Sequence, residues 1–494
     1  MGSDTPDGLF DESLIERVMP DLSVIQAGAG IHKRFKPFDP DLVMMVPPSL
    51  DEWLPEVHLS RFIADVVDSQ LDLSKFYASY AKAKGQPPYD PRLMVRVLLY
   101  GYCVGVRSSR ELERACVDVV AFRWLTAQQA PDFRSIARFR KRHLSALGNV
   151  FLQALELCRA AGMVSLGQVA LDGTKVRANA SRRKAMSYAR LTQRQKVLAE
   201  EVSDLLAEAE AIDTAEDTRF GKDKRGDELP AELARRETRL GKLAQARAAL
   251  EADAAAKARK DAEQKAREHG DEDGAVKEKG QDAAAKAVVG PKTQRNFTDP
   301  DSRIMKTADG SFHYCYNGFC LVDKDHQVIV SNDMTNTPND FEQLAPMIQK
   351  AEATLGVLPG QVLVDAGFCS VKNLEFAEGI EEASAGKTEF FIATRRLNAA
   401  EEAIMGTGQQ QAAAATAKLR MVQRLRSKHG HDIYARRKAI VEPVFGQIHT
   451  RQGKHVLLRG LDQAKHEWDL IAGCHNLLKL FSATTARSMN GLGT

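Results

Sequence analysis

The sequence lacks any run of about 18 consecutive apolar residues, which is the length that a membrane-spanning helix requires. Its first residues, MGSDTPDGLFDESL, are acidic, whereas a secretory leader begins basic and continues apolar. We therefore expect a cytoplasmic protein without membrane association. Hydrophobic residues make up 44% and charged residues 27% of the 494 residues, which is ordinary for a soluble globular chain. The length predicts about three domains.

Cysteine is sparse and irregularly placed. The seven cysteines are an odd number, and no two of them form a Cys-x-x-Cys pair. A disulfide framework needs paired cysteines and a zinc site needs closely spaced ones, so the sequence supports neither. We expect isolated thiols in a reducing compartment.

A large excess of one charge is also missing, because 69 Lys and Arg residues stand against 66 Asp and Glu residues and the net charge is +3. Net charge alone therefore does not indicate a nucleic-acid partner. The distribution of charge along the chain is more informative, because basic residues cluster at 134–143, 177–184 and 418–438. Such patches suit a DNA-binding protein, although each one also fits a solvated helix face.

Apolar residues recur at helical spacing over 58–160, after a polar and proline-rich lead-in at 1–57. Ser108 with Glu111 three residues later has the form of a capping box, which predicts that a helix starts there. A short helix over 119–125 and a turn after it are expected next. The region is therefore predicted to be an all-helical domain.

The last helix of this region, expected over 135–147, is strongly basic. A helix, a turn and a basic helix in that order are typical of a DNA-binding domain. The residues expected to contact DNA from this helix are Arg138, Arg140, Lys141 and Arg142. The alternative is a plain helical bundle with a basic outer face.

Strand signals begin at 169–176, and they return after residue 291. The later pattern reads as a hairpin over 312–322 and 327–331, a helix over 340–355, short strands at 361–365 and 389–394, and helices from 418 onward. This order predicts a mixed α/β core formed by residues 161–181 and 291–485.

Residues 182–290 interrupt that core after its first strand. They are rich in Ala, Glu, Lys, Arg and Asp, with leucines at helical intervals such as Leu240, Leu243 and Leu250. This composition predicts a helical insertion that pairs as a hairpin or coiled coil. The stretch 252–286 has almost no large apolar residue and is a candidate for disorder.

Two aspartates occupy unusual positions, Asp172 inside an apolar strand and Asp365 at the carboxyl end of another. A charge inside an apolar strand is costly unless it is paired or bound to a cation. If the two strands are neighbours, their carboxylates converge on one point and form a site for Mg²⁺ and phosphoryl transfer. Two metal ions roughly 3.5 to 4 Å apart then activate the attacking oxygen and stabilise the leaving one. Taken alone, an aspartate at a strand end is more often a turn former than a metal ligand.

Glu442 is the leading candidate for a third acid. Pro443 follows it, so a helix is expected to begin or to kink at the proline. Glu442 is then expected to face the sheet beside the helix N-terminus. His449 lies seven residues further on, nearly two helical turns, so it shares this face and is a candidate for a phosphate contact.

Several segments together resemble one known family, the DDE transposases of bacterial insertion sequences, and most closely insertion-sequence group 1182. The segments follow one order along nearly the whole chain: Pro47–Pro55, Ser108–Glu113, Pro131–Arg140, Leu171–Val176, Thr298–Arg303, Val364–Phe368 and Val441–Gln447. Each of these strings is a weak signal by itself, but their ordered occurrence is specific.

The resemblance implies an RNase H-like catalytic core in which Asp172, Asp365 and Glu442 are the metal-binding triad. It also implies a Tyr, Arg, Glu, Lys signature on the glutamate helix. Tyr434 matches the first position, and Arg437 or Lys438 matches the second. The spacing to Glu442 is one residue too long with Arg437, and His449 stands where the lysine is expected.

The function implied is metal-dependent strand cleavage at transposon ends and strand transfer into target DNA. The expected cofactor is two Mg²⁺ ions, with Mn²⁺ as a substitute, and the expected partner is double-stranded DNA. Because two DNA ends must meet, a homodimer is expected, with the helical insertion as a candidate interface. The further residues expected to contact DNA are Arg177, Arg303, Arg437, Lys438 and His449. Thr298–Arg303 fits equally a turn that presents Arg303 to DNA and a simple Asx turn.

Two other functions remain compatible with the sequence. A catalytically inactive transposase relative that only binds DNA as a regulator would show no Mg²⁺-dependent nicking of a duplex that contains a transposon end. A helical scaffold protein, suggested by the Ala, Lys and Glu-rich block, would show no salt-sensitive binding to DNA.

Overall fold

The computed structural model describes residues 49–80, 88–220, 231–268, 271–394 and 417–491. Of residues 1–52, only 49–52 are described, and Leu50–Trp53 form the short 3-10 helix η1. The predicted lead-in over 1–57 therefore lies mostly outside the described residues. Among the described residues, every helix is too short or too polar to cross a membrane.

The described residues between 59 and 160 form helices joined by short loops, as predicted. They are α3 (Leu59–Asp65), the π-turn η2 (Val66–Gln70), α4 (Ser74–Tyr77), η3 (Ala78–Tyr80), α5 (Pro91–Val104), α6 (Ser109–Asp118), α7 (Val120–Leu125), α8 (Phe133–Arg142), α9 (Leu144–Gly148) and α10 (Val150–Ala160). The central helix α5 starts where the Asp90 carboxylate accepts a hydrogen bond from Arg92 N and Pro91 fills the first turn. It ends at Gly105, whose φ of 86° favours glycine.

The starts of α6 and α8 differ in how they are capped. Ser108 is the N-cap of α6, as predicted, but its side chain makes no capping hydrogen bond. Asp132 caps α8 by accepting hydrogen bonds from Arg134 N and Ser135 N. The basic helix expected over 135–147 begins two residues earlier and breaks at His143, whose backbone is not helical.

A mixed sheet forms the rest of the core. Its strands are β4 (Arg303–Lys306), β5 (Phe312–Asp323), β6 (Ile329–Thr335), β1 (Gln168–Arg177), β7 (Gln361–Val364) and β8 (Glu389–Ile392). The strand order is β4-β5-β1-β7-β8, and β6 also pairs with β5. β1 is antiparallel to β5 and parallel to β7, and β7 is parallel to β8. The hairpin predicted over 312–331 is confirmed as β5 and β6.

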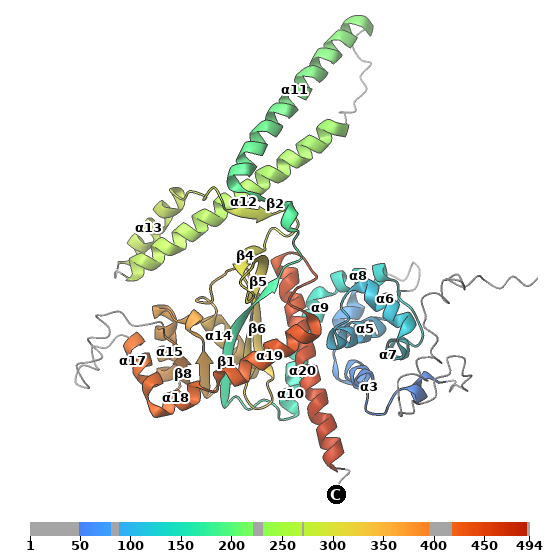
Figure 1. Cartoon of the computed structure of the whole chain (residues 1–494), viewed down its shortest axis with the longest axis vertical. Coiled ribbons are helices and arrows are strands. Elements are labelled where there is room, and N and C mark those ends of the chain that lie inside the picture. Colours follow the sequence, from blue (N-terminus) through green and yellow to red (C-terminus); the bar gives the residue numbers. More distant parts are fainter. Residues whose placement is uncertain (1–48, 81–87, 221–230, 269–270, 395–416, 492–494) are drawn as a thin grey trace, which may run out of the picture. The chain divides into compact units, whose positions relative to one another are not determined.

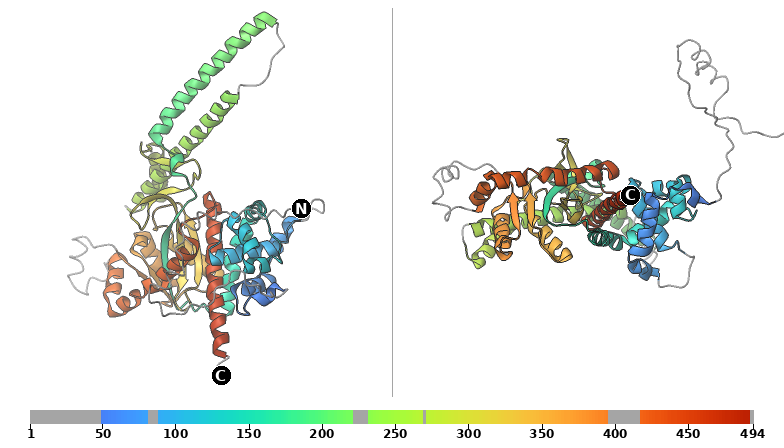
Figure 2. Two further views of the ribbon diagram at one scale, coloured as in Figure 1. Left: turned by 45° about the vertical axis from the view of Figure 1, so that its right-hand side comes forward. Right: turned by 90° about the horizontal axis from the view of Figure 1, so that it is seen from below.

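Helices cover both faces of this sheet (Figure 2). The helices that follow or flank the strands are α14 (Leu344–Leu355), η5 (Ala366–Phe368), α15 (Val371–Ala383), α17 (Ala417–Arg426), α18 (Lys428–Tyr434), α19 (Arg437–Gln452) and α20 (Leu461–Gly491). On one face, His449 of α19 contacts Thr174, and Trp468 of α20 donates to Phe319 O. On the other face, Met347 of α14 accepts from Ser331, and Phe368 packs on the ring of Phe319.

One hydrophobic core continues from the N-terminal helices into the sheet, through residues such as Leu98, Leu155, Ile471 and Leu321. Helix α20 packs against both α5 and α10, which ties the two regions together. All seven cysteines are free thiols, as predicted, and only Cys369 is not fully buried.

The predicted helical insertion contains α11 (Tyr188–Phe220), α12 (Ala231–Glu268) and α13 (Asp273–Ala285). Helices α11 and α12 lie side by side (Figure 1) and share a second apolar cluster that includes Leu191, Leu198 and Leu243. The strands β2 (Ala185–Ser187) and β3 (Gln294–Asn296) pair where the insertion leaves and re-enters the core. Helix formation over most of 252–286 means that the disorder expected there is wrong for the described residues.

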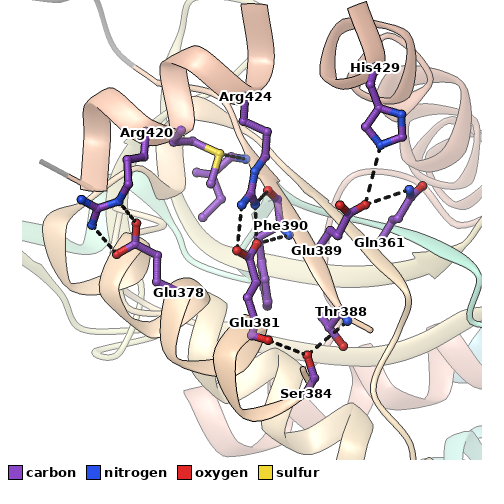
Figure 3. A network of polar contacts seen from close by, with 12 residues as sticks. Gln361, Glu378, Glu381, Ser384, Thr388, Glu389, Phe390, Arg420, Arg424 and His429 are labelled. Atoms are coloured by element: carbon purple, nitrogen blue, oxygen red, sulfur yellow. Dashed lines mark hydrogen bonds and ion pairs between the residues drawn. The ribbon is translucent and has the colours of Figure 1, made fainter. Parts of the chain in front are cut away.

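The edge strand β8 is capped by side chains (Figure 3). Glu381 on α15 accepts a hydrogen bond from Phe390 N, and Arg424 on α17 donates to Phe390 O. Arg424 also forms an ion pair with Glu381. The polar backbone groups of an edge strand would otherwise invite pairing with another chain. This network also fixes α17, from which the chain leads through α18 into α19.

Candidate active site

The two aspartates singled out from the sequence lie beside each other on two neighbouring parallel strands, where β7 ends and β1 continues. In the pairing of β1 with β7, Leu171 is opposite Val364, and the next residues along the two strands are Asp172 and Asp365. β1 continues past this point against β5, where Asp172 is opposite Cys320. The sequence-based interpretation required these two strands to be neighbours, and they are.

Arg437, the first residue of α19, joins the two carboxylates. Its Nη1 donates to Asp172 Oδ2 over 2.9 Å, and its Nη2 lies 3.2 Å from Asp365 Oδ1. The Arg437 side chain is only 7% exposed, whereas Asp172 is 22% and Asp365 43% exposed. The three residues form a buried arginine bridge that opens to solvent on the Asp365 side.

Burial and neighbouring charges set the protonation of this bridge. Burial raises the pKa of Asp172 above its ordinary value, and the nearby Arg437 opposes this shift. Burial alone would lower the pKa of Arg437, but Asp172, Tyr434 and Asp365 outweigh it and the net shift is upward. The guanidinium therefore stays charged, and the site carries two acidic groups around one fixed cation.

Glu442 does not join these two acids. It is exposed on α19, and the described residues contain no cluster of three His, Cys, Asp or Glu side chains that could hold a metal. The helix begins at Arg437 and runs through Pro443, so the start expected at the proline is wrong. Ile440, Val441 and Val444 take the face toward the sheet, and Glu442 is turned about 100° from Val441. The structure thus brings two of the three predicted acids together.

His449 contacts the site strand, as its position on the helix suggested. Its Nε2 lies 3.4 Å from the hydroxyl of Thr174, which is two residues beyond Asp172 on β1. Burial and the nearby Lys454 lower the pKa of His449, so the imidazole is neutral near pH 7. Glu442 lies seven residues before His449 and therefore on nearly the same side of α19.

A second polar cluster, which sequence reasoning missed, lies on the other face of β1. Asp340 Oδ1 accepts hydrogen bonds from Asn317 Nδ2 over 2.6 Å and from Lys175 Nζ over 3.3 Å. Asp340 also lies close to Gly367, at the turn that follows Asp365. The only sequence signal is Lys175 in the same motif as Asp172, because the pairing of Lys175 with Asn317 follows from strand register.

The residues predicted to contact DNA have different surroundings. Arg138, Lys141 and Arg142 are exposed on α8, and Lys438 is exposed on α19. Arg177 is partly exposed and pairs with Asp309 over 3.0 Å. Arg140 is buried instead, and its guanidinium donates to Arg107 O over 2.6 Å. The prediction that Arg140 faces DNA is therefore corrected, because this side chain belongs to the helical core.

The Thr298–Arg303 segment forms a turn that caps α20. Asp299 accepts hydrogen bonds from Tyr316 Oη and Gly460 N, and Asp301 accepts one from Leu461 N. Arg303 donates to three carbonyls of this turn and pairs with Asp253 of α12 over 2.7 Å. Both interpretations of this segment place a turn here, and the turn is present; Arg303 ties it to the helical insertion through Asp253.

The metal-binding side chains around the arginine bridge suit a divalent cation in part. Asp172 and Asp365 offer carboxylate oxygens, which are the ligands that Mg²⁺ prefers. The guanidinium of Arg437 stands between them as a protein cation, which is direct evidence that this point favours positive charge. The third carboxylate, Glu442, is on the correct helix but its side chain is in solvent.

Two family models match the chain. One, described as a transposase domain (DUF772), covers residues 48–142, and the other, described as a transposase DDE domain, covers residues 286–477. The first falls on the N-terminal helices. The second includes Asp365, Arg437 and Glu442. A search among curated proteins and a search among solved structures each found no match.

Proposed function

We propose that this chain, which belongs to the DDE transposases of insertion sequences, cleaves DNA strands at the ends of its element and joins them to target DNA. The two transposase models, one on the helical region and one on the sheet, support this proposal. The assignment to insertion-sequence group 1182 rests on the sequence segments described above and is part of the proposal.

We further propose that the core is RNase H-like, in residues 161–181 and 291–485, with a DNA-binding domain at 58–160 and an insertion at 182–290. A mixed sheet with antiparallel β5 and β6, parallel β1, β7 and β8, and helices on both faces is consistent with this fold. An insertion directly after the first core strand is also consistent with it.

The proposed catalytic residues are Asp172, Asp365 and Glu442. Together they are to hold two Mg²⁺ ions, or Mn²⁺ in their place, which supply positive charge to the reacting phosphate. Asp172 and Asp365 lie on adjacent strands and both pair with Arg437, and Glu442 is on the same helix, α19, as Arg437 and His449. Its side chain has to turn inward from solvent when the site is loaded.

Cationic side chains around this point are proposed to bind the DNA backbone. Arg437 and Lys438 lie at the start of α19, and neutral His449 can donate a hydrogen bond to a phosphate. At a greater distance, Arg138, Lys141 and Arg142 on α8 are proposed to position the transposon end. A homodimer is expected to hold two ends, with the helical insertion as a candidate interface.

The observation that carries the proposal is the adjacency of Asp172 and Asp365 on β1 and β7. Its test is nicking of a duplex that contains the inverted-repeat end, in the presence of Mg²⁺. Asp172→Ala, Asp365→Ala and Glu442→Ala should each abolish cleavage while binding to the same duplex stays nearly unchanged. Normal cleavage by one of these variants removes that residue from the site, and a wild-type chain that binds but never nicks is only a DNA-binding regulator.

A further inference from the structure

The arginine bridge uses the same carboxylate oxygens that a metal ion needs. Arg437 takes Asp172 Oδ2 and Asp365 Oδ1. The remaining oxygens have backbone donors, because Gly173 N donates to Asp172 Oδ1 over 2.8 Å and Gly367 N lies 3.4 Å from Asp365 Oδ2. These backbone contacts can persist when a cation binds. Within the part of the chain that the structure describes, the Arg437 guanidinium is the cation that pairs with both aspartates.

A guanidinium and a divalent cation cannot share this position, because both carry positive charge and both require the two facing oxygens. The Arg437 side chain is 7% exposed, so water cannot screen the repulsion well. Removal of Arg437 without a replacement would leave two neighbouring carboxylates uncompensated. Loading the site with metal therefore requires that Arg437 leave as the cation enters.

We propose that Arg437 is the resident counter-ion of the metal-free site, and that its displacement by divalent cations frees its guanidinium to bind a DNA phosphate. This inference rests on the proposed function. Arg437 then competes with the cations for Asp172 and Asp365 in the metal-free site, and once displaced its guanidinium binds a phosphate of the DNA.

The local chain geometry permits such a transfer. Arg437 is the first residue of α19, and only Ala435 and Arg436 separate that helix from Tyr434 at the end of α18. Arg436 and Lys438, on either side, are both exposed. A freed Arg437 would join two cations that already face solvent. Its planar fork of donors suits two oxygens of one phosphate, as it now suits one oxygen from each aspartate.

The competing explanation is that Arg437 is a permanent tie that fastens α19 to β1 and β7. Metal affinity separates the two explanations. If Arg437 competes with the metal ion, removal of Arg437 should strengthen metal binding. If Arg437 is a permanent tie that preserves the geometry of the site, its removal should weaken metal binding or leave it unchanged.

The first experiment measures Mn²⁺ binding to the full chain by calorimetry, without DNA. Arg437→Gln should bind Mn²⁺ about tenfold more tightly than wild type, since one competing charge is gone. Arg437→Lys keeps the charge and should bind close to wild type. The matched control is Arg436→Gln, which removes a neighbouring exposed cation and should bind as wild type does. Affinity for Arg437→Gln that is equal to or lower than that of wild type overturns the inference.

Folding of the variant is checked in the same material. Without metal, Arg437→Gln should melt at a lower temperature than wild type, because two carboxylates lose their counter-ion. Added Mn²⁺ should raise its melting temperature more than it raises that of wild type. An equal rise in both proteins also contradicts the inference.

The second experiment tests the release of Arg437 to DNA. Ca²⁺, a hard cation that takes oxygen ligands, is added to the wild-type chain and the end-containing duplex, and the gain in duplex affinity is measured. This gain should be smaller for Arg437→Gln than for wild type and for Arg436→Gln. An identical gain in all three proteins overturns the release of Arg437 to phosphate.

The two proposals fail in different ways. If wild type binds no Mn²⁺ at this site, so that Asp172→Asn changes nothing, then the proposed function fails and the inference fails with it. If wild type binds Mn²⁺ and Asp172→Asn abolishes binding, but Arg437→Gln brings no improvement, then only the inference fails.

Discussion

The carboxylate of Glu467 lies 3.5 Å from the guanidinium of Arg107, and neither side chain is more than 5% exposed. Arg107 precedes α6 in the N-terminal helical region, whereas Glu467 is on α20, which packs on the sheet. Glu467 also accepts hydrogen bonds from Tyr102 Oη and from the backbone of Leu457 and Leu458. One buried carboxylate thus joins the region matched by the first transposase model to the core matched by the second.

The first prediction concerns this joint. Glu467→Ala should lower the free energy of unfolding by about 3 to 5 kcal/mol, because it leaves Arg107 buried and unpaired. Urea denaturation of the full chain measures the change. The matched control is Glu156→Ala, which removes an ion pair with Arg159 whose side chains are more than half exposed, and it should leave the free energy of unfolding nearly unchanged. Similar losses in both variants would show that the buried pair does not join the two regions.

The second prediction is a pH dependence that comes from His475. This histidine is buried in α20 and contacts Gln327 O, and burial lowers its pKa to about 3. The unfolded chain takes up the proton below about pH 6.5, whereas the folded chain does not. Its contribution to stability is therefore complete above pH 6.5 and is lost as pH falls from 6.5 toward 3.

At pH 5 the loss due to His475 should be about 2 kcal/mol, since one pKa unit corresponds to about 1.4 kcal/mol. Urea midpoints of wild type and His475→Gln at pH 7.5 and pH 5 measure it, because other titrating groups are common to both proteins. The glutamine variant should lose less stability than wild type between the two pH values. Equal losses would mean that His475 takes up its proton in the folded state.

Local patterns predicted the elements of the active site but not its contacts. Apolar runs located β1 and β7, and the position of Asp172 within one run and Asp365 at the end of the other indicated a shared site. Arg437 contacts Asp172 across 265 residues of sequence, and no local rule connects them. The resemblance to the transposase signature indicated Arg437 as a residue that contacts DNA. It did not predict the ion pairs of Arg437 with Asp172 and Asp365.

At Pro443, packing of the core overrides the local rule that proline begins or kinks a helix. Pro443 was expected to start or kink a helix, yet α19 begins six residues earlier. Ile440 and Val441 before the proline, and Val444 after it, are all buried against the core. Burial of these side chains outweighs the hydrogen bond that proline cannot donate. Because the helix already includes Glu442 when it reaches Pro443, the position of Glu442 on the helix is set by Arg437–Val441, and its side chain is exposed.

The third prediction concerns the cap on the edge strand β8. Glu381→Ala removes the acceptor of Phe390 N and the ion-pair partner of Arg424, and it should cost about 2 to 3 kcal/mol of stability. Glu378→Ala on the same helix, α15, is the control. It breaks a more exposed ion pair with Arg420 and should cost less than about 1 kcal/mol. Urea denaturation compares the two, and equal costs would mean that the edge cap contributes nothing beyond a surface ion pair.

The fourth prediction separates exposed from buried arginines on α8. Arg138→Ala should weaken binding to the end-containing duplex, and it should reduce the slope of log affinity against log salt by about 0.9 if it removes one phosphate contact. Lys141→Ala should act in the same way, and both variants should unfold at the wild-type urea concentration. Binding measured by fluorescence anisotropy at several salt concentrations gives the slope.

Arg140→Ala should show the opposite behaviour. Its guanidinium lies 5.6 Å from the ring centroid of Tyr102 and donates to Arg107 O, next to the buried pair with Glu467. Its loss should cost about 2 kcal/mol or more of stability, because a buried carbonyl loses its donor. For folded Arg140→Ala protein, the slope of log affinity against log salt should equal that of wild type. A reduced salt slope together with wild-type stability would show that Arg140 contacts DNA. Helix α8 would then have to rotate when the chain binds DNA.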